Sequence, residues 1–357
     1  MIRAPEPGPR RGKATIEEVA RAAGVSRQTV SNALNAPQRV RDATLARVMD
    51  AIEQLGYQPD SSARSLRTGE RRALGYLAPA DDPFDPNPLM GGFLEALVDA
   101  AGAEGFRVLL FRPAPGARDA RAVLDEVIAA RQVDGFVLSD VLEGDARVEH
   151  VARAGVPFVT FGRAEAPGGG AAAGGALPLS ASWVDVDNAA AVEAIVAHLA
   201  GLGHHRVVYL GSETGLPWMK ERRAGFRRAA SAAGLERLES VAPLDDPAGV
   251  VAVAREALGR RPTAIVAESD SLALAAYEAV RSEGLAVGAD VAVTGFGDAP
   301  VARVLHPGLT SVRLPLRAIA GEIVRRLVGQ VRGEAGPAEG LSLAAELVVR
   351  ESSGPPR

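Results

Sequence analysis

Side chains that can read a DNA duplex recur in a short segment near the amino end of the chain. Arg27, Gln28, Ser31 and Asn32 would face outward at a helix over residues 28–34, because the apolar side chains between them fall on the opposite side. Arginine can pair with two acceptors of guanine, and glutamine or asparagine with adenine, each worth about 1–3 kcal/mol of discrimination. The pattern therefore indicates a helix that reads the major groove, although an ordinary three-helix module with solvated polar residues has the same periodicity.

Two further helices are needed to position such a reading helix. Thr15 and Glu18 have the spacing of a capping box, and helically spaced apolar residues follow them. Gly24 can end this first helix in the left-handed conformation, and Ser26 can cap the second. Two helices joined by a short turn with glycine match the helix-turn-helix pattern. A third helix over residues 42–55 is expected to supply core side chains from Leu45, Val48, Ile52 and Leu55.

Hydroxyl, amide and guanidinium groups around these helices suit contacts with DNA phosphates, which fix the register of a protein on the duplex. The predicted phosphate contacts are Thr15, Ser26, Thr29, Ser31, Asn35 and Arg39. Residues 1–72 hold 13 Lys/Arg against 8 Asp/Glu, whereas the rest of the chain is net −9, within a total of −4. A basic head on an acidic body is expected if the head alone meets nucleic acid.

Beyond residue 73, short apolar runs alternate with helical stretches. The predicted strands are 74–78, 108–111, 135–138 and 158–161, followed by 183–186, 207–210, 264–267 and 291–296. Strands that alternate with helices indicate parallel sheets with helices on both faces, and the two runs predict two similar lobes. The low-complexity stretch 167–176 between them is expected to be a surface loop. The predicted fold class is a small all-α helix-turn-helix domain joined to a two-lobed α/β body.

Composition excludes several protein classes. The chain has 357 residues, is 47% hydrophobic and contains no cysteine, so disulfides, thiolate metal sites and a cysteine nucleophile are ruled out. Residues 1–12 are rich in Pro, Gly and Arg and lack the apolar core of a signal peptide. No apolar run approaches the ~20 residues of a membrane span. We therefore expect a cytoplasmic globular protein with no membrane partner, preceded by a disordered tail over residues 1–13.

The crevice between two such lobes is the expected ligand site, because the carboxyl ends of parallel strands meet there. Asp, Ser and Arg side chains at these ends suit hydrogen bonds with hydroxyl groups, and an aromatic ring can stack on a sugar. The predicted effector-binding residues are Asp82, Phe84, Asp140, Arg163, Trp218, Arg222, Ser269, Asp270 and Asp298. For each of them the alternative is a turn or capping role, and Asp270 and Asp298 in particular could cap the helices that follow them.

The head residues also carry a family resemblance. The stretch TIEEVARAAGVSRQTVSNALN resembles the amino-terminal signature of LacI-type bacterial transcription regulators, and GYQPDSSARSLRTG resembles the hinge helix of that family. The resemblance continues to about Ser352 and implies that Arg27, Gln28 and Asn32 contact base edges. It also implies that residues 61–67 form a helix on DNA, with Leu66 wedged into the central base step of a palindromic operator. The implied minor-groove residues of this hinge are Ala63, Arg64 and Leu66.

The resemblance extends to the effector site. Residues 220–226 resemble the arginine-then-glycine motif of the family, whose first arginine, here Arg222, binds effector. Ser269 stands where many members have asparagine, and Gly297 stands where a sugar-binding aspartate is frequent. These two departures argue against a monosaccharide bound in the usual pose. The resemblance implies that the effector is a sugar or oligosaccharide.

In this family the two lobes are not contiguous in the sequence. The implied domains are 14–58 for the DNA-binding head, 59–72 for the hinge and linker, 73–184 plus 313–333 for the first lobe, and 185–312 plus 341–352 for the second. Two heads on one palindrome require a homodimer, and the carboxyl end lacks the heptads of a tetramerising coiled coil. We expect a repressor whose lobes close around effector and thereby weaken operator binding, although an effector that acts as a corepressor remains open.

Rival functions lack their signatures. A two-lobed solute receptor needs an export signal, and a nicotinamide enzyme needs G-x-G-x-x-G where residues 78–83 read APADDP. A hydrolase or metalloenzyme needs a triad or a ligand cluster, and the adjacent His204 and His205 more simply mark the end of a helix. The sequence therefore predicts no enzyme, no cofactor and no metal.

Overall fold

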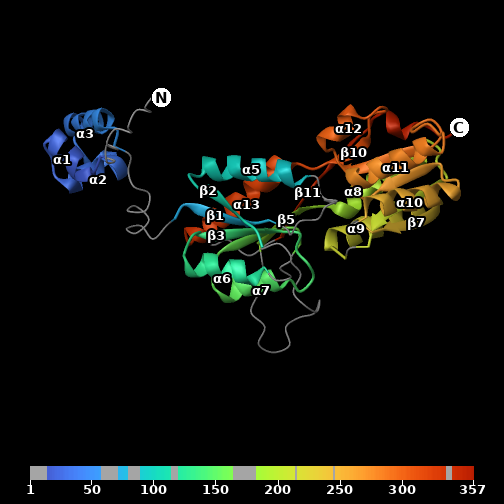
Figure 1. Ribbon diagram of the computed structural model, residues 1–357, viewed down its shortest axis with the longest axis horizontal. Helices are drawn as coiled ribbons and strands as arrows, with labels where there is room; N and C mark the ends of the chain where they lie inside the picture. Colours follow the sequence, from blue (N-terminus) through green and yellow to red (C-terminus); the bar gives the residue numbers. More distant parts are fainter. Residues whose placement is uncertain are drawn as a thin grey trace, which may run out of the picture. The chain divides into compact units, whose positions relative to one another are not determined.

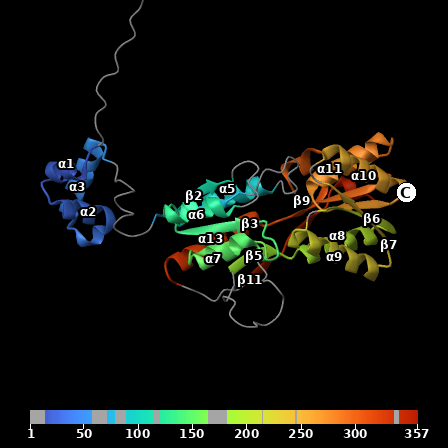
Figure 2. The same cartoon turned by 60° about the horizontal axis from the view of Figure 1, so that its bottom comes forward.

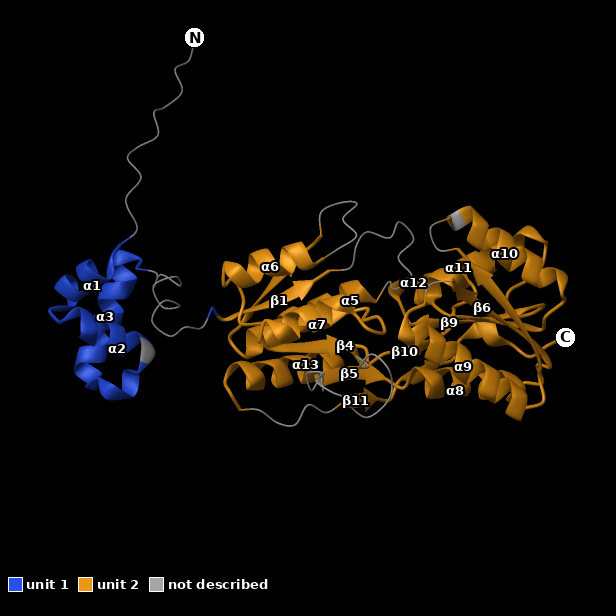
Figure 3. Ribbon diagram, turned by 90° about the horizontal axis from the view of Figure 1, so that it is seen from below, with its two compact units in different colours: residues 1–71 blue, residues 72–357 orange. Residues whose placement is uncertain are grey.

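The computed structural model describes residues 14–57, 71–78, 89–113, 120–163, 182–213, 215–243, 246–334 and 340–357, apart from the side chains of Asn35 and Pro247. The chain divides into two compact units, Met1–Arg71 and Arg72–Arg357 (Figure 3). Each unit has a hydrophobic core of its own.

The first unit is a three-helix module built from α1 (Ile16–Ala23), α2 (Arg27–Asn35) and α3 (Asp42–Leu55), with the short 3-10 turn η1 (Pro37–Arg39) between the last two (Figure 1). The predicted capping box is present: Thr15 accepts the Glu18 backbone N–H, and the Glu18 carboxylate accepts the Thr15 N–H. Gly24 ends α1 in the left-handed region at φ 64°. Local capping signals thus place the reading helix where the sequence predicts it.

The core of this unit centres on Val19, Val30 and Val48, one from each helix and each fully buried. Leu55 was expected to join them but is 40% exposed. The buried stripe of α3 runs through earlier turns, and Leu55 lies at its edge in the last turn of the helix. Tyr57, just beyond the helix end, packs against the core instead.

The second unit contains two six-stranded sheets with helices on both faces (Figures 1 and 2). In the first sheet all pairings are parallel, in the order β11 (Gly340–Leu343), β5 (Ser182–Val186), β4 (Phe158–Phe161), β3 (Gly135–Ser139), β1 (Ala73–Leu77) and β2 (Arg107–Phe111). The order in the second is β12 (Glu346–Val348), β10 (Thr310–Arg313), β9 (Ala292–Gly297), β8 (Ala264–Ala267), β6 (Arg206–Ser212) and β7 (Glu236–Ala242), with β12 antiparallel to β10. The predicted fold class is confirmed.

The inner strands of each sheet, such as β3 and β9, are buried because helices cover both faces. On the first sheet, α5 (Met90–Ala103) and α13 (Leu316–Val331) pack on one face, and α6 (Arg121–Ala129) and α7 (Ala146–Arg153) on the other. On the second sheet the corresponding pairs are α8 (Asn188–Gly201) with α9 (Pro217–Ala232), and α10 (Pro247–Gly259) with α11 (Asp270–Ser282). The short α12 (Pro300–Val304) follows β9, and η2 (Glu351–Ser353) is the last element before the carboxyl end at Arg357.

Within the described residues the chain passes between the two sheets at three places, after β5, after β10 and after β11. These places differ from the expected boundaries. Residues 185–186 and 341–343 were assigned to the second lobe, but Asp185 pairs with Ser342 inside the first sheet. Residue 313 was assigned to the first lobe, but Arg313 pairs with Gly297 in the second sheet. Strand pairing is a non-local property, so the apolar runs alone did not reveal which sheet each strand joins.

Across the described helices, none is both long enough and apolar enough to cross a membrane.

Candidate functional site

The exposed side of α2 brings the predicted base-contacting residues together. Arg27 and Gln28 are exposed and Asn32 is half-buried. Gln28 Nε2 donates a hydrogen bond to Asn32 Oδ1 at 3.0 Å. Arg27 Nη1 lies 3.0 Å from Glu17 Oε1 of α1, and the two side chains stay 69% and 50% exposed. Exposed ion pairs of this kind contribute about 0–1 kcal/mol, so the guanidinium can exchange partners at small cost.

The hydroxyl groups expected near phosphates are held by helix capping. Ser26 Oγ accepts the Thr29 N–H at 3.1 Å and lies 2.9 Å from Thr29 Oγ1. Thr15 belongs to the capping box of α1, so these oxygens have fixed positions at the amino ends of two helices, where backbone N–H groups favour anions. Arg39 is exposed at the end of η1, and Ser31 is half-buried on α2.

Several predicted contacts cannot be located. The side chain of Asn35 is outside the description of the structure, as are the hinge residues Ala63, Arg64 and Leu66 and the cleft residues Asp82 and Phe84. Their proposed roles therefore rest on the sequence alone.

In the second unit a hollow of about 380 Å³, open mouth included, lies between the two lobes. Its polar lining consists of Ser139, Asp140, Asp185, Asn188, Trp218 and Arg222. The main apolar lining residues are Leu89, Met90, Phe161 and Leu314. The first lobe supplies Asp140 and Asp185, and the second supplies Asn188 and the two α9 residues, Trp218 and Arg222. Three of the predicted effector-binding residues, Asp140, Trp218 and Arg222, thus come together in one place.

Arg222 is the most constrained of these side chains. Its Nε donates to Asn188 Oδ1 at 2.9 Å, and its Nη1 donates to the Glu268 carbonyl oxygen at 2.8 Å. The guanidinium stacks 3.4 Å from the centroid of the Phe296 ring and 4.2 Å from that of the Trp218 ring. Burial lowers the pKa of Arg222 to about 10, so the side chain stays protonated at neutral pH. Arg222 is therefore a rigid cation in the wall of the hollow.

Polar contacts from α9 cross the cleft to the first lobe. The atoms involved are Trp218 Nε1 with Asp140 Oδ1 at 3.4 Å, Lys220 Nζ with Glu143 Oε2 at 3.6 Å, and Arg163 Nε with Glu221 Oε1 at 3.4 Å. Arg163 itself does not line the hollow, because its guanidinium lies 5.1 Å from the Trp183 ring centroid and beside Glu221. These contacts join the lobes along the first turns of α9.

Asp185 and Asn188 line the hollow but were not predicted. Asp185 Oδ1 accepts the Val186 N–H at 2.7 Å and a hydrogen bond from Asn188 Nδ2 at 3.4 Å. Burial raises the pKa of Asp185 to about 6, and the Glu221 carboxylate adds to this rise while Arg222 opposes it. An acidic residue near the end of a buried strand is the signal that could have identified Asp185, but that strand was assigned to the other lobe.

Ser269 and Asp270 were expected to bind effector, but neither lines the hollow. Ser269 Oγ accepts the Leu272 N–H at 3.3 Å and caps α11. The Asp270 carboxylate accepts a hydrogen bond from Ser311 Oγ at 2.6 Å and one from the Ala299 N–H at 2.7 Å. Both side chains thus brace the loops at this end of the second sheet.

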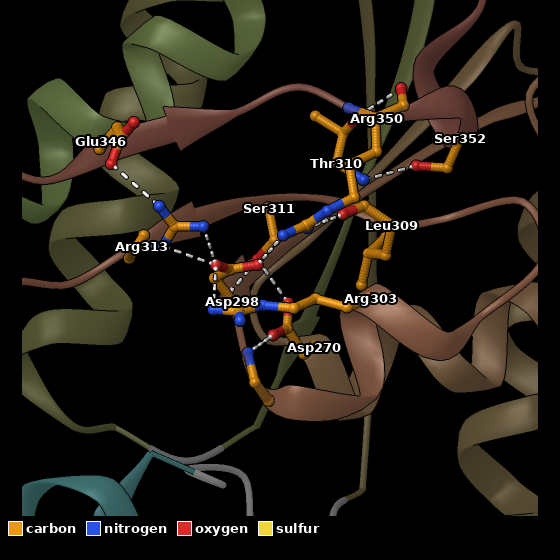
Figure 4. A network of polar contacts seen from close by, with 11 residues as sticks. Asp270, Asp298, Arg303, Leu309, Thr310, Ser311, Arg313, Glu346, Arg350 and Ser352 are labelled. Carbon is orange, nitrogen blue, oxygen red and sulfur yellow. Dashed lines mark hydrogen bonds and ion pairs between the residues drawn. The ribbon is translucent and has the colours of Figure 1, made fainter.

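Asp298 is likewise outside the lining of the hollow and is surrounded by arginines (Figure 4). Its side chain is fully buried and pairs with Arg313 at 2.7 Å, Arg350 at 2.5 Å and Arg303 at 3.6 Å. The preceding Gly297 has φ 133° and Asp298 has φ 48°, so the backbone turns sharply here. The carboxylate therefore ties β9 to β10 and to the carboxyl-terminal segment.

Of the two adjacent histidines, His204 has a structural role. His204 is buried, and its Nε2 lies 2.9 Å from the Gly354 carbonyl oxygen, so the ring anchors the end of the chain. Among the residues that the structure describes, no group of three or more His, Asp or Glu side chains could hold a metal ion.

Each of the two units matches a known protein family. Residues 15–60 match the model of the bacterial regulatory proteins of the lacI family, and residues 196–353 match a periplasmic binding protein-like domain. The HTH-type transcriptional regulator CelR of Thermobifida fusca is 33% identical over 349 residues, which cover 96% of this chain and 99% of that protein. A solved complex of the regulator CelR with cellobiose is 31% identical with a TM-score of 0.69, covering 95% and 100% of the two chains. The lac repressor dimer bound to operator shares the fold, with a TM-score of 0.78 at 22% identity over 96% and 100% of the chains.

Proposed function

The chain belongs to the LacI family of bacterial regulatory proteins, which makes it a DNA-binding transcription regulator, and from this premise we propose that it is a repressor controlled by a sugar. In this proposal a dimer binds a palindromic operator and releases it when a sugar or oligosaccharide occupies the cleft. The observation that carries the proposal is the combination, in one chain, of an exposed polar α2 and a hollow lined by Asp140, Trp218 and Arg222.

We assign the reading of bases to Arg27, Gln28 and Asn32. These residues share the accessible side of a capped helix, and their side chains match the donor and acceptor pattern of the major groove. The proposed phosphate contacts are Thr15, Ser26, Thr29, Ser31, Asn35 and Arg39. The proposed minor-groove contacts are Ala63, Arg64 and Leu66. Two heads bound at mirrored half-sites require a homodimer.

The effector is proposed to be a sugar because the hollow combines hydroxyl-binding groups with aromatic and apolar walls. The CelR regulator with 31% identity was solved as a complex with cellobiose, which makes cellobiose the first compound to test. Asp140, Trp218 and Arg222 are the proposed contacts from the described lining. Asp82 and Phe84 remain proposed from the sequence, and Arg163, which lies outside the lining, is proposed to reach the effector only if it leaves Glu221.

Control of DNA binding is proposed to follow from lobe closure. Contacts from α9 already join the lobes across the cleft, and a bound ligand would add further contacts to both sides. A closed body would hold the two hinge segments at a spacing that weakens their pairing on DNA. Coupling between two sites is reciprocal, so operator must weaken effector binding by the same factor, typically about 5–150-fold.

The test is a pair of titrations on the full chain. Operator affinity is measured by fluorescence anisotropy with and without saturating cellobiose, maltose or ribose, and sugar affinity is measured by calorimetry with and without operator. The proposal expects at least one sugar to weaken operator binding, with an equal factor in the reverse titration. A sugar that binds with identical affinity in the presence and absence of operator would refute the coupling, and one that strengthens operator binding would make the effector a corepressor.

A catalytic role is the competing proposal, and no specific observation favours it. The comparisons are with named transcription regulators, which supports a regulatory role without turnover. We expect incubation with aryl glycosides to release no product, and we expect the protein to act in the cytoplasm, where its operator lies.

A further inference from the structure

The charged groups in the hollow are unevenly divided between the lobes. Asp140 directly follows β3 and Asp185 belongs to β5, so both carboxylates come from the first sheet. The polar lining from the second lobe consists of Asn188, Trp218 and Arg222, and Arg222 is its cation. The lining that the structure describes therefore holds two carboxylates against one guanidinium.

Arg222 gives the hollow no surplus positive charge. Two of its N–H groups are already engaged, by Asn188 and by the Glu268 carbonyl oxygen. The carboxylates of Glu268 and Asp185 are close enough to stabilise the charged guanidinium against the cost of its burial. A ligand anion would have to compete with these carboxylates, whose field is strong because the surroundings are desolvated.

Asp185 is placed to meet a ligand without moving. Strand β5 is paired on both sides, with Asp185 beside Ser342 of β11 and Val184 beside Phe161 of β4. The carboxylate is oriented by the Val186 N–H and by Asn188. A side chain fixed in this way on a strand that is paired on both sides loses little entropy on binding, and an ionised carboxylate accepts stronger hydrogen bonds than a neutral oxygen does.

We propose that the cleft accepts an uncharged, hydroxyl-rich effector and that Asp185 selects it. Asp185 accepts a hydrogen bond from a ligand hydroxyl, and it repels ligands that carry a phosphate or carboxylate group. This inference rests on the proposed function of the cleft as the effector site, and it narrows the effector to neutral sugars and excludes sugar phosphates and sugar acids.

The same geometry makes binding depend on pH. Glu221 and Arg222 of α9 face Asp185 with opposite charges, Asn188 of α8 and the backbone of Arg163 after β4 face it with hydrogen-bond donors, and its own pKa is raised to about 6. Asp185 is therefore mostly ionised at pH 7.5 and mostly protonated at pH 5. Because the ionised form is the better acceptor, affinity for a neutral sugar falls as the pH drops through about 6.

The test compares neutral and anionic sugars on the full chain by calorimetry. The neutral probes are cellobiose, maltose and ribose, and the anionic probes are cellobionic acid and glucose 6-phosphate. The variant Asp185→Asn keeps the shape of the side chain and removes its charge. The matched control is Asp187→Asn, two residues away, because exposed Asp187 caps α8 by accepting the Ala190 N–H at 2.9 Å and asparagine caps equally well. Thermal unfolding followed by circular dichroism checks that both variants fold.

We expect the unmodified chain to bind a neutral sugar at least tenfold more tightly than either anionic probe. Asp185→Asn should weaken binding of that sugar about tenfold and reduce the ratio of its affinity to that of the anionic probes. Asp187→Asn should change neither the affinity nor the ratio. Should Asp185→Asn fail to fold, the pH profile of the unmodified chain decides, since affinity for the neutral sugar must fall between pH 7.5 and pH 5.

Three results would overturn the inference. The first is equal affinity of the unmodified chain and Asp185→Asn for a neutral sugar, or an affinity that does not change with pH. Either would show that Asp185 does not bind the sugar, and the proposed function would stand. Binding of glucose 6-phosphate or cellobionic acid as tight as that of the neutral sugars would overturn the class of effector. Absence of binding by every sugar would overturn the proposed function and this inference together.

Discussion

At the scale of single residues, the proposed reading of DNA depends on side chains that have partners in the structure but can exchange them. Arg27 pairs with Glu17 at 3.0 Å while both side chains stay at least half exposed. Gln28 and Asn32 are joined by a hydrogen bond that a base edge can replace. Side chains that contact base edges give sequence specificity, whereas side chains that contact phosphates add affinity for any sequence.

The two roles are separable by substitution. Arg27→Ala should cost about 1–3 kcal/mol on the preferred operator and relax preference at one base pair. Arg39→Ala should weaken binding to all DNA sequences by similar factors. The slope of log affinity against log salt concentration should fall in magnitude by about 1. The measurement is operator affinity for single-base variants at several salt concentrations. Uniform weakening by Arg27→Ala, or loss of preference at one base by Arg39→Ala, would contradict the assignments.

Asp298 illustrates a charged residue whose role is structural. Asp298→Asn leaves Arg350, Arg313 and Arg303 around a buried neutral group, and we expect it to lower the free energy of unfolding by about 2–3 kcal/mol. This loss of stability is smaller than that for breaking a fully buried ion pair, because Arg313 and Arg303 are partly exposed and solvent screens their charges. Chemical denaturation of the two proteins gives the difference.

Glu346→Gln is the matched control for this substitution, because Glu346 pairs with the same Arg313 at 3.3 Å but is 68% exposed. It should cost less than about 1 kcal/mol. Equal losses for the two variants would show that burial of Asp298 contributes nothing to stability.

At the scale of elements, the carboxyl-terminal segment is fixed to the second lobe by buried polar groups. Ser353 Oγ lies 2.9 Å from His198 Nε2, and His204 Nε2 bonds to the Gly354 carbonyl oxygen. Burial lowers the pKa of both histidines, and the nearby charges of His198 and His205 lower the pKa of His204 further. The neutral form of the rings is therefore the one that the fold stabilises.

This pairing predicts an acid-sensitive lobe. A histidine whose pKa is lower folded than unfolded costs the fold nothing above the unfolded value near 6.5, and it removes stability as the pH falls below that value. Asp185, whose pKa is raised to about 6, acts with the opposite sign in this window, so the two proteins are compared. On going from pH 7.5 to pH 5.5, the unmodified chain should lose more stability in urea than His204→Gln, which retains an N–H donor without titrating. Parallel pH profiles for the two proteins would refute this account.

Elements of the head could be predicted almost to the residue, while those of the body could not be assigned to their sheets. Thr15, Gly24 and Ser26 mark helix ends by local chemistry, which a sequence displays directly. The membership of β5 and β11 depends on pairing between Asp185 and Ser342, residues far apart in the chain. The same limit hid Asp185 from the candidate site, and it hid the contacts of Asp270 with Ser311 and of Asp298 with Arg313 and Arg350.

At the scale of the whole molecule, recognition and sensing lie in separate compact units, Met1–Arg71 and Arg72–Arg357. The reading helix α2 belongs to the first unit, and the hollow lined by Asp140, Asp185 and Arg222 belongs to the second. The proposed hinge residues precede the boundary between the units in the sequence and lie outside the described residues. Regulation by a ligand therefore requires the second unit to change how two copies of the first are presented to DNA.

The measurement that tests this account most directly is selection of bound DNA from a random pool by the full chain, at moderate ionic strength, with and without cellobiose. The account predicts enrichment of one palindrome with two mirrored half-sites, and loss of that enrichment when the effector sugar is present or when Arg27 is replaced by alanine. Recovery of DNA with no preferred palindrome over bulk genomic fragments would contradict it.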